Sequence, residues 1–157
     1  MTVYSQIGYF LTACSAFECV VDVAIKQQLG IDYRKAEILT VSLNFKARIS
    51  ILRSLLVEQK PNFDKAIDTL DIYENESKRN RIFHSHIFSD QRGEKITFVS
   101  GRADRKYTSK NDSFDEEQLK AHALKISKLG QLLMSELHIT ESDLNQFTSI
   151  RFTDSIV

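Results

Sequence analysis

The sequence has few of the residues that interrupt regular structure. It contains one proline, Pro61, and five glycines among 157 residues. A sandwich or barrel of many short strands needs more turn residues than this. The composition therefore favours helices, and the length fits a single folded domain over residues 1–157.

Cysteine and net charge are also scarce. The only cysteines, Cys14 and Cys19, are five residues apart and form no CxxC pair, and on a helix they would point roughly 140° away from each other. We therefore expect two reduced thiols in a cytoplasmic protein, with neither a disulfide framework nor a zinc site. The formal net charge is zero, so any nucleic-acid binding must be local.

Long uninterrupted hydrophobic runs are absent as well. The segment from Tyr9 to Phe17 superficially resembles the core of a signal peptide, but no Lys or Arg precedes Lys26. Asp22 interrupts the most apolar stretch before it reaches the roughly 18 residues that a membrane span needs. We therefore expect neither export nor contact with a membrane.

The apolar residues that are present recur every three or four positions, as on one face of a helix. This spacing predicts helices over residues 3–28, 33–58 and 62–84, separated at Gly30 and at Pro61. A fourth helix is predicted through Leu133 after a cap candidate at Asp112-Ser113, and a short fifth helix after Thr140.

The periodicity changes between Ile87 and Tyr107, where Ile96 and Phe98 alternate with their neighbours and glycines punctuate the run. That pattern predicts a hairpin or an ordered loop. The expected fold is all-α, an up-and-down bundle of four to five helices with a small hairpin or loop inserted before the last long helix. The short links favour antiparallel neighbours.

Charge is unevenly distributed despite the neutral total. Residues 75–110 carry nine positive side chains against four negative ones, whereas residues 61–74 and 111–157 are acidic. A cationic segment can hold phosphate, with an affinity that falls as salt rises. The alternative is a solvated loop whose cations pair with the acidic flanks.

One short motif falls within the cationic segment. The run Arg79-Asn80-Arg81-Ile82-Phe83-His84 places a fixed cation, a carboxamide and an imidazole at one helix end. It resembles the signature of the HEPN family, an Arg followed by four to six residues and a His, with a polar residue after the Arg. The resemblance extends to the order of elements: two long helices, the motif ending the third, an insertion and a closing helix.

The resemblance implies a metal-independent endoribonuclease without a cofactor. His84 would act as general base, Arg79 would stabilise charge on the phosphate, and Asn80 would orient the imidazole or a phosphate. His84 and His86 form an HxH pair, but no nearby cysteine or spaced carboxylate completes a metal site. The expected phosphate- or RNA-binding residues are Lys78, Arg81, His86, Arg92, Lys95, Arg105 and Lys106.

The resemblance also implies partners. An ideal helix separates Arg79 and His84 by roughly 140°, and the family forms homodimers in which two motif helices face each other. RNA or a nucleotide would be the ligand, and an antitoxin-type protein a further partner if the chain is a toxin or defence component. The alternatives are a non-catalytic HEPN-like module that binds a nucleotide, RNA or protein, and a helical dimerisation protein without a ligand.

The same residues also have structural interpretations. His84 could interact with the last carbonyls of its helix. Arg79 could pair with Glu76 or Asp71, and Asn80 could help to end the helix.

Overall fold

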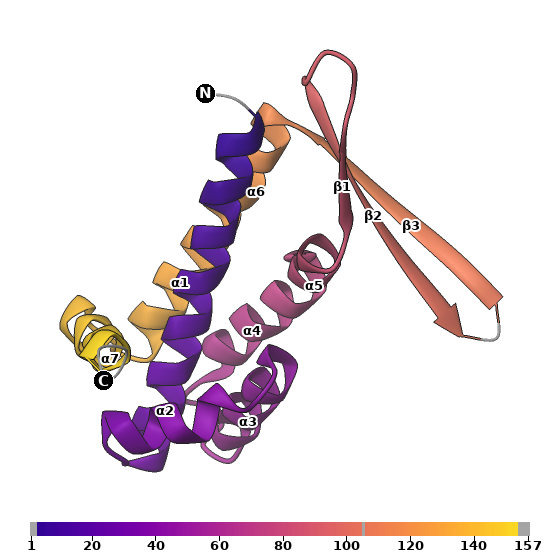
Figure 1. Ribbon diagram of the computed structural model, residues 1–157. Helices are drawn as coiled ribbons and strands as arrows, with labels where there is room; N and C mark the ends of the chain where they lie inside the picture. The colour runs from indigo at the N-terminus through magenta and orange to yellow at the C-terminus, as the bar shows by residue number, and fades with distance from the viewer. Residues whose placement is uncertain (1–2, 105, 154–157) are drawn as a thin grey trace.

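The computed structural model describes residues 3–104 and 106–153, without the side chains of 80, 81, 101–108 and 151–153. The chain is mostly helical and includes a small three-stranded sheet. The helices gather in a bundle, and strands β2 and β3 extend from it as an arm (Figure 1). The prediction of mainly helical structure is therefore confirmed.

Helix α1, Val3–Leu29, is the central element of the bundle. Gly30 ends it in the left-handed region at φ 62°, as its position predicted. By length and composition α1 could cross a membrane, but half of its most apolar stretch is buried inside the bundle. Its core-facing residues include Phe10, Cys14, Phe17, Val21 and Ile25.

The single helix predicted over residues 33–58 is wrong. The segment forms two helices, α2 (Tyr33–Val41) and α3 (Phe45–Val57). Asp32 caps α2, and the side chain of Asn44 caps α3 by accepting a hydrogen bond from the Ala47 N–H at 2.9 Å. The chain reverses at this break, so α3 runs in the same direction as α1: Arg48 near its start meets Asp22, and Gln59 just beyond its end meets Gln28.

The third predicted helix, over residues 62–84, is also divided. Helix α4 covers Asp64–Glu76, and a short helix α5 covers Arg79–Phe83. Between them Lys78 adopts φ 52°, a left-handed conformation that interrupts helical hydrogen bonding. The motif therefore occupies a separate turn of helix, and His84 lies just beyond its end.

The predicted hairpin or loop is a larger structure. Strands β1 (His86–Ser89), β2 (Lys95–Asp104) and β3 (Lys106–Asp115) form an antiparallel sheet in the order β1-β2-β3. Ile96 and Phe98 of β2 are buried, so one face packs near the bundle. The all-α expectation is therefore incomplete.

Helix α6, Glu116–Glu136, begins later than predicted because Asp112 and Ser113 belong to β3. Its cap is Asp115, which forms a capping box with Gln118 and so satisfies two backbone donors. The first turn of α6 is acidic, with Glu116 and Glu117, which suits the positive end of the helix dipole. Helix α7, Glu141–Thr153, confirms the short helix predicted after Thr140.

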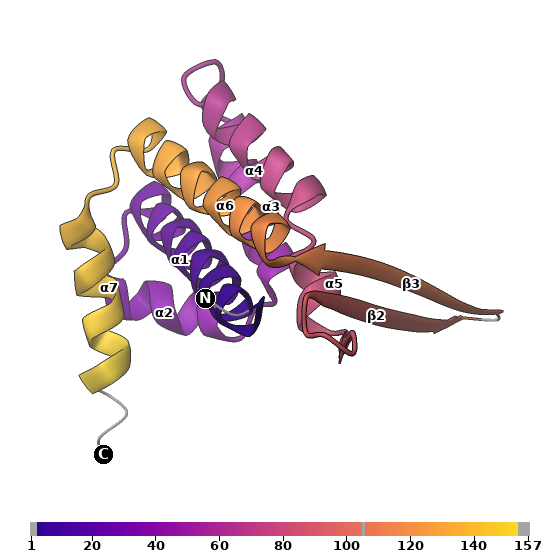
Figure 2. The ribbon, with the colours of Figure 1, turned by 90° about the horizontal axis from the view of Figure 1, so that it is seen from above.

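Helices α1 and α6 lie side by side and run in the same direction (Figures 1 and 2). Phe10 stacks on His122 at 5.4 Å, and Phe17 lies against Gly130, so the residue numbers rise together. Consecutive helices still alternate in direction. The break before α3 adds one reversal, which makes the first and last long helices parallel instead of antiparallel.

An aromatic cluster joins α1, α3 and α4 at the centre of the bundle. The rings of Phe17 and Tyr73 stack with centroids 3.7 Å apart, and Phe45 meets both edge-on at 6.5 and 5.5 Å. Such contacts stabilise a core beyond their buried area. Arg79 begins its helix directly beside this cluster.

Candidate functional site

Arg79 does not extend into solvent. Its Nε and Nη2 both lie 2.7 Å from Oε1 of Glu18 on α1, and its side chain is 18% exposed. The predicted pairing with Glu76 or Asp71 is wrong, because Glu76 pairs with Lys125 and Asp71 with Arg53. Arg79 therefore ties α5 to the long central helix.

Glu18 belongs to a larger charged network on the same side of α1. Its other oxygen lies 3.0 Å from Arg48 of α3, and Nη1 of Arg48 donates to both oxygens of Asp22 at 2.9 and 2.8 Å. The Asp22 side chain is fully buried. Because buried charges are costly unless they are paired, this network fixes Arg79 relative to α1 and α3.

Aromatic rings define the direction of the Arg79 guanidinium. It lies 4.3 Å from the ring centroid of Phe83 and 5.6 Å from that of Phe45, within the range of cation–π attraction. Phe83 is the last residue of α5, and His84 follows it with an exposed side chain. The cation therefore lies beside Phe83, the residue that precedes His84.

The helical geometry predicted for the motif requires correction. One continuous helix would place Asn80 and His84, four residues apart, on the same face, but α5 ends at Phe83. The backbone of Asn80 lies in α5, while its side chain lies outside the described residues. One chain thus brings Arg79 near the neighbour of His84 by folding the guanidinium over Phe83.

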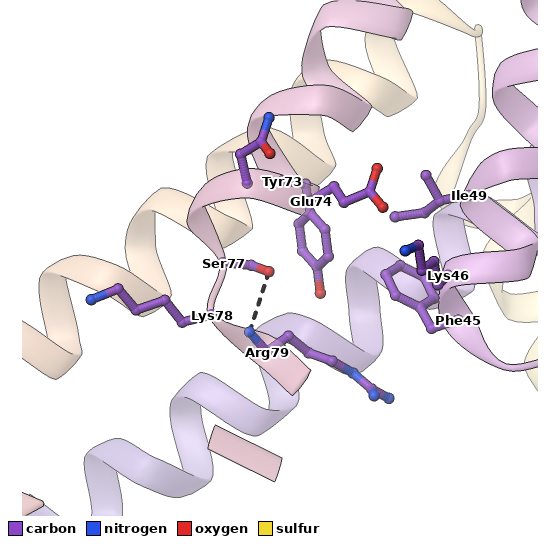
Figure 3. A pocket seen from close by; sticks show the side chains of 9 residues that line it. Phe45, Lys46, Ile49, Tyr73, Glu74, Ser77, Lys78 and Arg79 are labelled. Atoms are coloured by element: carbon purple, nitrogen blue, oxygen red, sulfur yellow. Dashed lines mark hydrogen bonds between the residues drawn. The ribbon is translucent and has the colours of Figure 1, made fainter. Parts of the chain in front are cut away.

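A cavity of about 260 Å³ opens beside Arg79 (Figure 3). Its apolar floor is formed by Phe45, Ile49 and Tyr73. The backbone N–H of Arg79 reaches the Ser77 hydroxyl at 3.4 Å. The polar rim is completed by Lys46, Glu74, Asn75 and Lys78.

A second cavity, of about 400 Å³, borders the charged network from the side of α2. Both Glu18 and Arg48 line it, together with Thr40. Among the described residues, the buried Thr40 hydroxyl and Arg48 Nε find no hydrogen-bond partner. Such groups are commonly satisfied by ordered water. The two cavities thus border the charged network on two sides, one at Arg79 and the other at Glu18 and Arg48.

Cys14 lies beneath the site but is unsuited to nucleophilic chemistry. Burial raises the pKa of its thiol to about 11, although an interaction with the Tyr73 hydroxyl partly opposes this. Burial likewise raises the pKa of Tyr73, and the neighbouring Cys14 adds to the effect. Both groups stay protonated at neutral pH, and the thiolate is the reactive form of cysteine.

The predicted phosphate-binding residues have different environments. Lys78 pairs with Asp112 at 2.9 Å and lies over the Phe114 ring, so it holds α5 to the sheet. Three others, on the sheet and its first turn, are exposed: His86, Arg92 and Lys95. Arg81 in α5 and Lys106 in β3 have side chains outside the described residues, and Arg105 is outside them altogether.

Sequence reasoning missed the residues that support Arg79. Glu18 and Asp22 are four apart on α1, so two carboxylates in an apolar helix were an available signal. His122 was missed too: its Nε2 lies 2.9 Å from the Ser77 carbonyl, and its ring stacks between Phe10 and Phe114. Nothing in the local sequence marks that histidine.

Within the residues that the structure describes, no group of three His, Cys, Asp or Glu side chains is arranged to hold a metal ion. Comparison with known proteins finds no matching family model, curated protein or solved structure.

Proposed function

We infer that this chain is a metal-independent endoribonuclease of HEPN type, in which Arg79 and His84 act on one phosphodiester. The observation that supports this is the position of the Arg79 guanidinium, 4.3 Å from the Phe83 ring and thus beside the residue that precedes His84. A fixed cation and an exposed imidazole are the two groups that such a reaction needs.

In the proposed reaction, His84 accepts the proton of a ribose 2′-hydroxyl. The 2′-oxygen then forms a bond to phosphorus, and the bond from phosphorus to the 5′-oxygen of the next nucleotide breaks. The departing oxygen takes up a proton from water, and protonated His84 returns its proton to the solvent, which leaves a 2′,3′-cyclic phosphate and a 5′-hydroxyl. Arg79 stabilises the extra negative charge of the phosphorane.

Glu18 would have two effects on that chemistry. Its 2.7 Å bonds fix the guanidinium in one orientation, and preorganised donors stabilise a transition state without paying to reorient. Its negative charge also offsets that of Arg79, so the substrate phosphate must share the cation. We expect weak ground-state binding and a larger contribution in the transition state.

Exposed basic side chains of the sheet would guide RNA to this site. His86, Arg92 and Lys95 are exposed on β1, on the turn after it and on β2. Contacts to phosphates release counterions, so binding should weaken steeply as salt rises.

The wider context is part of the same proposal. A homodimer, an antitoxin-type protein partner and a role as a toxin or defence component follow from the resemblance of the motif. A cytoplasmic location belongs to the same proposal. Substrate RNA would be available there.

One observation favours the alternative of a non-catalytic binding module. The Arg79 side chain is 18% exposed and ion-paired, so it also serves as a structural link between α5 and α1. In a binding module, the cavity beside Arg79 and the cations of the sheet would hold a nucleotide, an RNA or a protein without turnover. Binding would then depend on salt, and no product would form.

RNA cleavage in EDTA tests the catalytic proposal. Purified protein should release 2′,3′-cyclic phosphate ends, and His84→Asn should abolish this while folding normally, because His84 is exposed. The matched control is His138→Asn, since His138 is an exposed histidine at φ 54°, a conformation that Asn tolerates. Equal activity in the His84 and His138 variants would refute the role of His84.

A binding titration beside the cleavage assay separates the two functions. RNA that binds in a salt-dependent manner, remains intact and is released by Arg79→Ala would favour the binding module. Circular dichroism of Arg79→Ala is needed as a folding control, because this change also removes the ion pair with Glu18.

A further inference from the structure

The outer edge of strand β1 is open. In the described part of the chain β1 pairs only with β2, and all four of its residues are exposed. Ile87 is 51% and Phe88 57% exposed. Proteins usually protect such edges with lysine, proline or a covering element, and residues 86–89 contain neither lysine nor proline.

Hydrogen bonding within the sheet fixes which backbone groups face this edge. The Asp90 N–H donates to the Lys95 carbonyl at 3.1 Å, so Asp90 directs its backbone groups toward β2. Direction alternates along an antiparallel strand. His86 and Phe88 therefore also face β2, while Ile87 and Ser89 present their N–H and C=O groups to the open edge.

We propose that β1 pairs antiparallel with β1 of a second copy of this chain, around a two-fold axis at Phe88. In this register Ile87 of each copy lies opposite Ser89 of the other, so each outward N–H and C=O of β1 gains a partner. Phe88 then meets Phe88, and His86 lies opposite Asp90. The strand is thus complementary to itself in backbone pairing, in apolar contact and in charge.

The pairing joins two sheets into one of six strands. Their β2–β3 arms, which project from each bundle (Figure 2), would extend in opposite directions from the axis. Lys95, Lys106 and Lys110 lie on these strands, so an RNA could contact two cationic arms at once. Two linked contacts can bind much more tightly than one.

This interface differs from the facing-motif dimer that the family resemblance implies. The axis lies at Phe88 and β1 begins at His86, so the two His84 residues would lie beyond the strand on opposite sides of the axis. Each motif would then act with residues of its own chain. The inference does not rest on the proposed ribonuclease activity, and it requires only that β1 is accessible.

Disulfide trapping tests the register. At a pair whose backbone groups face away from each other, Cα atoms are about 4.5 Å apart, which suits a disulfide. In a Cys19→Ser background, Phe88→Cys should therefore form a covalent dimer on mild oxidation. Ile87→Cys is the matched control, because its counterpart is a diagonal neighbour roughly 7–8 Å away.

The mass of the native protein completes the test. A four-residue edge buries little area, so we expect a dimer that forms with rising concentration in analytical ultracentrifugation. Phe88→Lys, at an exposed site, should remain monomeric at the same concentrations, whereas Phe83→Lys should still dimerise.

Three results would overturn the proposal: crosslinking through Ile87→Cys but not Phe88→Cys, monomeric native protein at all concentrations, or a dimer lost through Phe83→Lys alone. The last would indicate the facing-motif arrangement. RNA cleavage by monomeric Phe88→Lys protein would leave the proposed function intact, and a β1 dimer without cleavage would leave only the interface.

Discussion

Removing Arg48 should show how strongly the buried network holds the bundle together. The Arg48 side chain is 13% exposed, and it faces both oxygens of the fully buried Asp22. Removing one partner of a buried ion pair typically costs about 3–5 kcal/mol. Because Arg48 retains some exposure, we expect Arg48→Met to lose about 3 kcal/mol, near the lower end of that range.

Urea denaturation and thermal unfolding measure this loss. In a domain of this size each kcal/mol lowers Tm by roughly 2–4 °C, so the variant should melt about 6–12 °C below the native protein. The control is the double variant Asp22→Leu/Arg48→Met, which removes both charges. Replacing a whole buried pair by apolar residues is often neutral, so the double variant should recover much of the loss.

Two outcomes would refute this reasoning. A loss below about 1 kcal/mol in Arg48→Met would mean that water solvates the network as it does a surface pair. A double variant as unstable as the single one would mean that the cost arises from packing around Arg48, not from the charge left on Asp22.

Three further predictions follow from local contacts. Asp115→Ala removes the capping box of α6 and should cost about 1 kcal/mol in urea denaturation. Iodoacetamide at pH 8 should modify Cys19 before Cys14, because burial raises the pKa of the Cys14 thiol to about 11. Equal rates of modification of the two cysteines in mass spectrometry would mean that the Cys14 thiol is accessible. Hydrogen bonds from Thr140 lower the pKa of Asp143, so its contribution to stability is present above about pH 4 and is lost at lower pH. Asp143→Asn should therefore be more destabilising at pH 6 than at pH 3 in urea denaturation, and an equal loss would contradict the linkage.

The helical part of the fold was largely predictable because its apolar spacing is regular. Periodicity could not reveal the break between α2 and α3, since Val41 and Phe45 are four residues apart and continue the same stripe across it. The signal that mattered was Asn44, a strong capping residue. Likewise, the break at Lys78 depends on a left-handed backbone conformation, which the presence of a lysine does not predict.

The sheet was only partly predictable because β3 is polar. Of its residues 109–115, only Phe114 is a large apolar side chain, so the alternation that identifies a strand is absent. Pairing with β2 along ten residues determines this strand. When a strand is stabilised mainly by pairing with its neighbour, its own sequence shows little of the alternating pattern by which strands are predicted.

The candidate site illustrates the same limit over a longer distance. The motif could be read from neighbouring residues, but the partner of Arg79 is 61 residues away at Glu18. Spacing rules for a single helix predict an ion pair of Arg79 with Asp71 or Glu76, but the packing of α5 against α1 places Glu18 beside Arg79 instead. Contacts between distant segments are set by how whole helices pack, which no local pattern specifies.

The packing of α1 on α6 also affects how the protein folds during its synthesis. Helix α1 is made before its main packing partner α6, which begins at Glu116. Ribosomes add about 5–20 residues each second, so roughly 5–20 s of synthesis separate the two. During that interval the apolar face of α1 stays exposed on the nascent chain. We therefore expect chaperones to bind it and truncated products to aggregate.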